Sequence, residues 1–267
     1  NYAWTDNTTG NVTLSWTINK KAVTITAKNQ TITYGSNIAT GPSYVTANSG
    51  GLVGGHAITA ITLAASTTLA TTSGTITPSA ATITGGGADV TSNYDISYAT
   101  GVLVINKKAV TITAKNQTIT YGSMIETGPS QVTASGLLSG HSVSSVVLNA
   151  STSSYTTNGT IAPSAATING DGTDVTANYE IAYADGRLVI NKKSVTITAK
   201  AQTLTYGESI ATGQDQVTAS GLVGGHTVSS IVLTASTDQY TTSGTITPSN
   251  ATISSGSENV TSNYDIT

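Results

Sequence analysis

Apolar and polar residues alternate along most of this chain with the two-residue period of a β-strand. The apolar residues of Val110–Ala114 alternate with threonines, and after a polar break those of Thr118–Tyr121 do so again. Such alternation is typical of half-buried strands, whereas no segment of ten or more residues has the apolar spacing of a helix. The pattern therefore predicts strands, and no helix longer than one turn.

Turn residues separate further strand candidates in the same part of the chain. Three more strands are expected, at Val132–Ala134, Val143–Leu148 and 159–168, with Pro163 interrupting the last. After them, Tyr179–Tyr183 and Arg187–Ile190 flank an Asp-Gly pair, Asp185 and Gly186, whose positive φ angles favour a tight hairpin. We expect a small antiparallel β-sandwich, Ig-like or β-grasp-related, of roughly six or seven strands.

One block of sequence recurs three times. Residues 18–36, INKKAVTITAKNQTITYGS, recur unchanged at 105–123, and a close variant begins at Ile190. A fixed period indicates an array of one repeated unit. The predicted domains are residues 20–106, 107–191 and 192–267, called here the first, second and third repeats.

No flexible linker separates the repeats. The last strand expected in the first repeat, Val102–Ile105, is followed by Val110–Ala114 after only four residues, without Gly/Ser-rich or Pro-rich sequence. A unit of this size has a thin core, and with no Phe it must be built from Val, Ile, Leu, Ala and Tyr, so neighbours should add stability. We expect the repeats to lie end to end as a stiff rod.

Composition narrows the possible functions. Only 9% of the residues are charged and the net charge is −3, which provides no field suited to holding nucleic acid phosphates. The chain has no Cys, so it has neither disulfides nor thiolate metal sites. No apolar run approaches the 18 or so residues of a membrane span, and no signal peptide is recognisable. A cysteine-free composition of this kind is common in bacterial surface proteins.

Both ends of the chain depart from the repeat pattern. Residues 1–19 begin with the Asn-Tyr pair of the closing hairpins but contain both tryptophans, and are predicted to be the closing hairpin of an upstream Ig-like domain. The third repeat stops at Thr267, before its own closing hairpin. The chain, which lacks an initiator Met, is interpreted as a window on a longer array. The alternative is a head-to-tail filament, in which the first hairpin completes the third repeat of another copy by strand complementation.

Lysines recur at three equivalent positions and account for nine of the ten basic residues. They are Lys20, Lys21, Lys28, Lys107, Lys108, Lys115, Lys192, Lys193 and Lys200. One interpretation is that they prevent wrong strand pairing between near-identical repeats. The other is a ladder that contacts acidic or sulfated glycans weakly and gains avidity from tandem copies. Tyr side chains such as Tyr44, Tyr155 and Tyr240 could also stack on sugars, but packing at strand positions explains most of the tyrosines.

No residue pattern points to catalysis, a cofactor or a metal. The three histidines, His56, His141 and His226, occupy one turn position in different repeats, so they are expected to be solvated turn residues. Asn169, Asp171 and Asp174 resemble a loose calcium loop, but the other repeats lack it. Since motifs for nucleophiles, zinc and phosphate are absent, we predict no enzyme activity and no catalytic, cofactor-binding or metal-binding residues.

The repeats resemble a known family. The string VTITAKNQTITYG, a following GLxxG turn and the ending NY(D/E)IxYxxGxLVINK are similar to the MBG domain of the YGX type, with Tyr34-Gly35, Tyr121-Gly122 and Tyr206-Gly207 as its most specific parts. The resemblance covers all three repeats. It implies an extracellular, cell-surface location and the role of a stalk or spacer in a bacterial adhesin, with mucin or glycan contact as a second possibility. It implies no catalytic residue.

Overall fold

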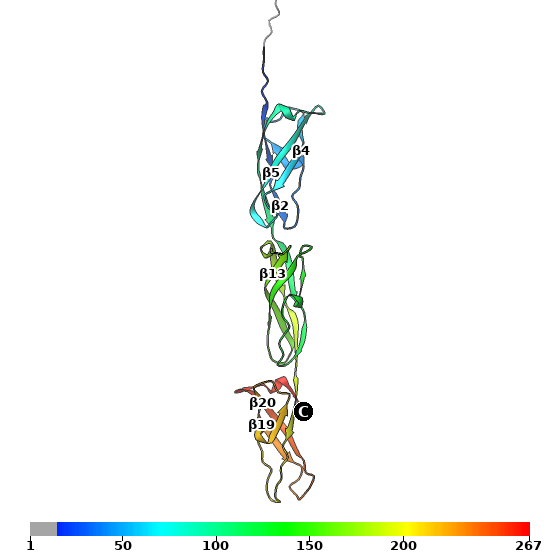
Figure 1. The fold of residues 1–267 in the computed structure, drawn as a ribbon, viewed down its shortest axis with the longest axis vertical. Coiled ribbons are helices and arrows are strands. Elements are labelled where there is room, and N and C mark those ends of the chain that lie inside the picture. The colour runs from blue at the N-terminus through cyan, green and yellow to red at the C-terminus, as the bar shows by residue number, and fades with distance from the viewer. Residues whose placement is uncertain (1–14) are drawn as a thin grey trace, which may run out of the picture. The chain divides into compact units, whose positions relative to one another are not determined.

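The structure, a computed structural model, describes residues 15–267 (Figure 1). The chain forms two compact units, one ending at Lys108 and the other comprising Ala109–Thr267. The described residues are all-β, as the alternation predicted. Their helical turns are 3₁₀ turns of three residues each: η1 Pro42–Tyr44, η2 Thr91–Asn93, η3 Pro129–Gln131, η4 Thr176–Asn178, η5 Gln214–Gln216 and η6 Thr261–Asn263.

The first repeat is a sandwich of two sheets. Its strands are β1 Lys21–Ala27, β2 Gln30–Thr33, β3 Val45–Ala47, β4 His56–Ala65, β5 Thr71–Gly85, β6 Ala88–Asp89, β7 Tyr94–Ala99 and β8 Gly101–Asn106. One sheet has the order β3-β1-β7, and the other has the order β2-β8-β5-β4 with β6 beside β5. The first segment of the repeat therefore contributes β1 to one sheet and β2 to the other.

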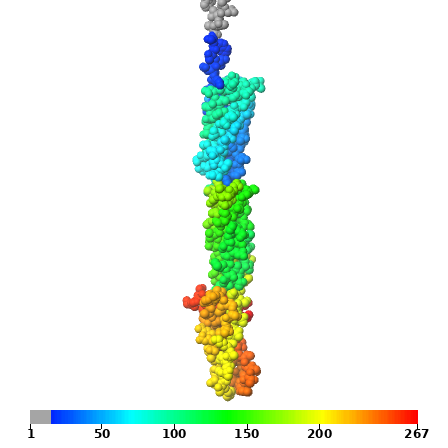
Figure 2. Space-filling view, in the orientation of Figure 1, coloured from blue at the N-terminus to red at the C-terminus, as the bar shows by residue number. Residues whose placement is uncertain are grey.

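The second repeat has the same arrangement. Its strands are β9 Lys108–Ala114, β10 Gln117–Thr120, β11 Val132–Ser135, β12 Ser142–Ala150, β13 Thr156–Gly170, β14 Thr173–Asp174, β15 Tyr179–Ala184 and β16 Gly186–Asn191. The sheets have the orders β11-β9-β15 and β10-β16-β13-β12, with β14 beside β13. On the face seen in Figure 2, side chains fill the surface of this repeat, drawn in green, without a deep hollow.

The third repeat has fewer strands. They are β17 Lys193–Ala199, β18 Val217–Ser220, β19 His226–Ala235, β20 Ile246–Ser255, β21 Glu258–Asn259 and β22 Tyr264–Ile266. The sheets have the orders β18-β17-β22 and β19-β20-β21. Neither 202–205, the counterpart of β10, nor 241–245, the counterpart of the start of β13, is a strand.

The core of the second repeat lies between its two sheets. Ile112 of β9, Ile161 of β13 and Leu188 of β16 are completely buried there. Their side chains come from alternate positions, which explains why a two-residue period encodes this fold.

Two details of the predicted fold are wrong. The sheets are mixed rather than antiparallel, because β1 pairs with β7 and β2 with β8 in parallel. Alternation reports which residues face the core but not the direction of the neighbouring strand. The hairpin predicted at Asp185-Gly186 does not form, because β15 and β16 belong to different sheets.

A close approach of backbones, rather than a hairpin turn, explains the glycine at this position. Neither Asp185 nor Gly186 has a positive φ. A Cβ atom on Gly186 would lie 2.6 Å from the carbonyl oxygens of both Ala114 and Lys115, so only glycine fits where the chain passes from one sheet to the other.

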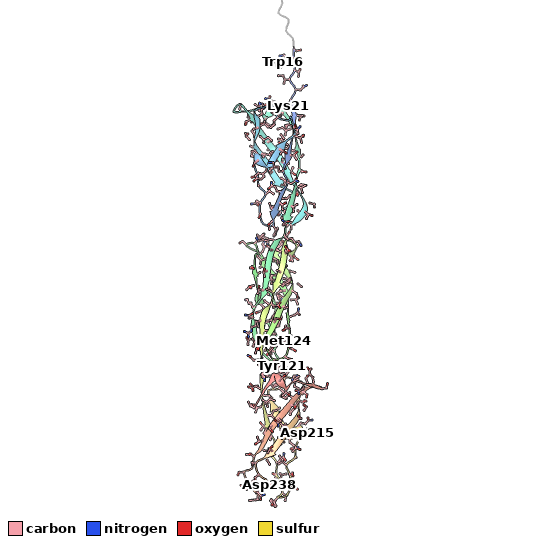
Figure 3. The ribbon with its side chains drawn as sticks, turned by 180° about the vertical axis from the view of Figure 1, so that it is seen from behind. Trp16, Lys21, Tyr121, Met124, Asp215 and Asp238 are labelled. Atoms are coloured by element: carbon pink, nitrogen blue, oxygen red, sulfur yellow. The ribbon has the colours of Figure 1, made fainter. Side chains whose placement is uncertain are left out.

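The closing hairpin predicted over residues 1–19 falls largely outside the described residues. Its described part, 15–19, forms no strand, and Trp16 and Ile18 are 78% and 76% exposed. Figure 3 shows Trp16 before the start of β1, away from the sheets.

Candidate interface between the second and third repeats

Each repeat contains a His–Tyr hydrogen bond. In the third repeat, His226 Nδ1 lies 2.7 Å from the hydroxyl oxygen of Tyr264, and the backbone N–H of Val223 donates to the same oxygen over 3.0 Å. Because that oxygen accepts from Val223, its own hydrogen is available for donation to the imidazole. The equivalent sets are His56–Tyr94–Val53 and His141–Tyr179–Leu138.

The prediction of solvated turn histidines is therefore wrong. Each imidazole is half-buried and fastens the preceding GLxxGH-type turn to the start of a strand through a tyrosine hydroxyl. His and Tyr recur 38 positions apart in all three repeats, but every pair of equivalent residues in these repeats keeps its spacing, so the sequence contains no signal specific to this pairing.

A tyrosine of the second repeat packs on this His–Tyr pair of the third. The ring of Tyr121 lies edge-on to that of Tyr264, with 5.4 Å between centroids, and 6.0 Å from the ring of His226. Burial raises the pKa of the Tyr121 hydroxyl, and the neighbouring Tyr264 raises it further. Beside it, a Cβ atom on Gly122 would lie 2.6 Å from a methyl group of Val223. The Tyr-Gly pair thus forms a close contact between two repeats.

A buried amide makes a second connection. The side chain of Asn263 is 4% exposed, and its Oδ1 atom accepts from the backbone N–H of Tyr155 in the second repeat over 2.7 Å. The Lys192 ammonium lies 5.2 Å from the centroid of the Tyr155 ring, within cation–π range. Aromatic packing, one buried hydrogen bond and one cation–π contact therefore join the two repeats.

The repeated lysines lie near the ends of central strands rather than along sheet edges. β1, β9 and β17, which begin at or beside them, each have a neighbour on both sides. Lys200 Nζ donates to the backbone oxygen of Asp215, 2.7 Å away on an exposed surface. Protection against wrong pairing and glycan contact both stay predictions.

The loop that resembles a calcium site is held by turn capping. The carboxylate of Asp174 accepts from the hydroxyl and the backbone N–H of Thr176, and these hydrogen bonds lower its pKa. In the third repeat a neutral residue, Asn259, caps Thr261 in the same way. Among the described residues, no three His, Cys, Asp or Glu side chains lie close enough to hold a metal. The hydrogen bonds with Thr176 explain the carboxylate of Asp174 at this position.

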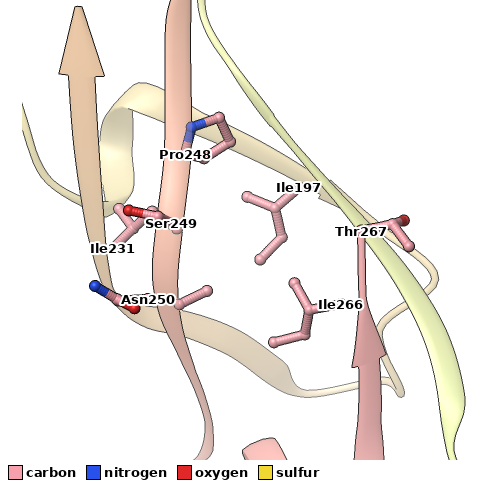
Figure 4. Close-up of a pocket in the computed structure, with 8 residues that line it drawn as sticks. Ile197, Ile231, Pro248, Ser249, Asn250, Ile266 and Thr267 are labelled. Carbon is pink, nitrogen blue, oxygen red and sulfur yellow. The ribbon is translucent and has the colours of Figure 1, made fainter.

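An apolar hollow in the third repeat has a structural explanation. It is lined by Ile197, Ile231 and Ile266 together with 248–251 and Thr267 (Figure 4). In the second repeat, the hydroxyl of Tyr183 reaches the counterpart of this place and accepts from the N–H of Ala166 over 2.8 Å. The third repeat contains no counterpart of Tyr183, and the hollow marks the position of that side chain.

Comparison with known families supports the predicted resemblance. The family model of the MBG domain (YGX type) matches residues 23–104, within the first repeat, and confirms the resemblance over that range. The second and third repeats share sequence motifs with this matched region, and the second also shares its strand order. No curated protein and no solved structure matches the chain. In the described part, no helix is long and apolar enough to cross a membrane.

Proposed function

We propose that this chain is an extracellular structural region of a bacterial surface adhesin, in which MBG-type repeats act as a stiff spacer between other parts of the protein. The observation that supports this is the direct contact between the second and third repeats, where Tyr121 packs on Tyr264 and His226. A joint held by buried side chains restricts the angle between two domains more than a flexible linker does. The proposed role includes no enzyme activity.

The stiffness of this joint can be measured in the full chain. Because the chain lacks Cys, spin labels can be attached to Asn149→Cys in the second repeat and Thr234→Cys in the third, both exposed positions. Electron–electron resonance should give one narrow distance distribution. Tyr121→Ala should broaden it, whereas the control Tyr206→Ala, at a tyrosine that is 74% exposed, should not. A broad distribution that Tyr121→Ala leaves unchanged would contradict a stiff spacer.

Weak multivalent binding of glycan or mucin is the first alternative. The tyrosines suggested for sugar stacking differ in surroundings, since Tyr155 faces Lys192 while Tyr240 is 86% exposed. Mucin binding by the full chain, abolished by Tyr240→Ala together with Tyr155→Ala, would favour this alternative. Absence of binding would leave the spacer.

Head-to-tail assembly by strand complementation is the second alternative. Its structural correlate is the third repeat, where 202–205 and 241–245 have no strand partner, while Trp16 and Ile18 are exposed. Small-angle scattering over a dilution series distinguishes this filament from a single, unassembled spacer. Particles that lengthen with concentration, and that shorten when residues 1–19 are deleted, would indicate a filament.

A further inference from the structure

The first and last segments of a complete repeat run side by side in one parallel register. In the first repeat, Lys21–Thr26 pair with Tyr94–Ala99, and Gln30–Thr33 pair with Leu103–Asn106. In both pairings the partner lies 73 positions later, so the two form one ladder that passes from one sheet to the other. Tyr34 extends this ladder by donating its N–H to the carbonyl of Asn106, 2.8 Å away.

The second repeat has the second half of this ladder in the same parallel direction. Gln117–Thr120 pair in parallel with Leu188–Asn191, and β9 lies beside β15 in the other sheet. The N–H of Tyr121 donates to the carbonyl of Asn191 over 2.9 Å.

An asparagine ties the ladder together where it changes sheets. The backbone N–H of Val102 donates to Asn29 Oδ1 over 2.8 Å, and that of Arg187 donates to Asn116 Oδ1 over 2.7 Å. At the same point Gly101 comes so close to the first segment that a Cβ atom would lie 2.5 Å from the carbonyl oxygen of Ala27. No gap therefore opens between the two halves of the ladder.

The direction of this pairing decides how a repeat responds to tension. The chain enters a repeat at the start of the first segment and leaves at the end of the last. Because the segments are parallel, pulling on the two ends slides them in opposite directions along their length. All hydrogen bonds of the ladder are then strained together, whereas a hairpin pulled at its open end loses them one at a time.

We propose that this parallel ladder is a mechanical clamp, by which each complete repeat resists extension when the chain is under tension. Buried side chains on both segments, such as Val23 and Ile25 on β1 and Leu103 and Ile105 on β8, cover the core face of the ladder. The clamp extends the proposed spacer function but does not depend on a stiff joint, since it acts within one repeat.

The third repeat provides an internal comparison. Its ladder is limited to Lys193–Val195 with Tyr264–Ile266, extended by the hydrogen bonds of Thr267 with Val195 and Ile197. Ala201 stands where the other repeats have the asparagine tie, Asn29 and Asn116. The third repeat should therefore yield first, at the lowest force.

Single-molecule force spectroscopy on the full chain, held through cysteines added at its two ends, tests the clamp. We expect one unfolding event at low force and two at distinctly higher force. Pulling the second repeat through Cys substitutions at Ser153, in the β12–β13 turn, and Asn191 changes the direction of strain and should lower its unfolding force. Three events of equal force, or no dependence on pulling direction, would overturn the proposal.

One substitution separates the asparagine tie from general stability. Asn116→Ala leaves the N–H of Arg187 without its partner, which costs about 1 kcal/mol, so one high-force event should become roughly fivefold faster at constant force. Asn158→Ala, at an exposed asparagine in the same repeat, should leave all rates unchanged. If Asn116→Ala also leaves them unchanged, the tie is not part of a clamp. A broad spin-label distance distribution together with high unfolding forces would disprove the stiff spacer but not the clamp. A narrow distribution together with low unfolding forces would disprove the clamp but not the stiff spacer.

Discussion

The second and third repeats have nearly the same local sequence but differ in which residues form strands. Residues 117–120 read QTIT and form β10, whereas 202–205 read QTLT and form no strand. Similarly, 156–160 begin β13, but the almost identical 241–245 are irregular. In Figure 1 the yellow and orange loops of these third-repeat segments stand apart. The difference shows that these strands depend on a partner, β16, that inserts between them in the second repeat.

The second and third repeats also differ in the exposure of equivalent apolar residues. Ile161 is completely buried in the second repeat, and its counterpart Ile246 is only half-buried. Tyr121 packs on the third repeat, whereas its counterpart Tyr206 is 74% exposed. Burial of Ile161 thus depends on the closing strand β16, with which it pairs, whereas Tyr121 is covered by its contact with the third repeat.

The largest expected effect comes from supplying the closing strand. Appending a copy of residues 183–191 after Thr267 adds counterparts of Leu188 and Ile190, which are almost completely buried in the second repeat. Burial of two such side chains should stabilise the third repeat by about 3–6 kcal/mol. Hydrogen exchange should then protect the amides of 202–205 and 241–245.

A matched control is the same appended segment with serine at the counterparts of Leu188 and Ile190. This control segment should add little to the stability of the third repeat. Amides of 202–205 that stay unprotected with the apolar segment would contradict the role assigned to the closing strand.

Truncation of one core side chain should lower the free energy of unfolding less in the third repeat than in the second. Ile161→Ala removes a side chain with no exposure and should lower the free energy of unfolding by about 2–5 kcal/mol. Ile246→Ala should cost about half as much, because less apolar area is lost from a half-buried site. Denaturant unfolding followed by hydrogen exchange measures both, and equal losses would mean that the two cores are alike.

The glycine at the change of sheets should tolerate no side chain. Gly186→Ala places a methyl group against two carbonyl oxygens and should destabilise the second repeat by about 1–3 kcal/mol. The control Gly224→Ala has open space around the new methyl group and should change the stability by less than about 0.5 kcal/mol. Thermal unfolding compares the two, and a neutral Gly186→Ala would disprove the close approach.

The smallest expected effect is on the pH dependence of stability. It should differ between the second repeat, which has the carboxylate of Asp174, and the third, which has the neutral Asn259 at the same position. Hydrogen bonds from Thr176 lower the pKa of Asp174 in the folded state, so their contribution is present above the ordinary carboxyl pKa and is lost as pH falls through the lowered value. The third repeat has neutral Asn259 there and should lack this contribution.

An NMR titration should show a lowered pKa for Asp174, and Thr176→Val should return it toward the ordinary carboxyl value. Asp174→Asn should remove this part of the acid sensitivity. An unchanged titration in Thr176→Val would contradict the assigned cause.

Much of the fold could be predicted from alternation, but its closure could not. The strands near Val110–Ala114 and Val143–Leu148 were expected because inward residues recur at every second position. The hairpin at Asp185-Gly186 was wrong because Asp-Gly is also compatible with an extended crossing between two sheets. Pro163 does not end β13; it pairs with Leu148 of β12, next to the pair of Val147 and Ser164 at which the register between the two strands shifts.

The interface was only partly visible in the sequence. Tyr121-Gly122 stands out in the sequence as a repeated pair, but the pair does not say which repeat the tyrosine contacts, and the His–Tyr hydrogen bonds were not predicted. Which repeat the tyrosine contacts depends on where the end of β10 lies when the next repeat begins at β17.

By itself the sequence determined the all-β class, the threefold repetition and the residues that face each core, because these depend on composition and on a two-residue period. Only the tertiary structure decided that the first and last segments run parallel, that Asn29 and Asn116 bridge the two sheets, and that QTIT is a strand where QTLT is not. The physical reason is that a strand's hydrogen bonds are made with a partner far away along the chain. The partner's presence and direction are therefore not encoded in the local pattern.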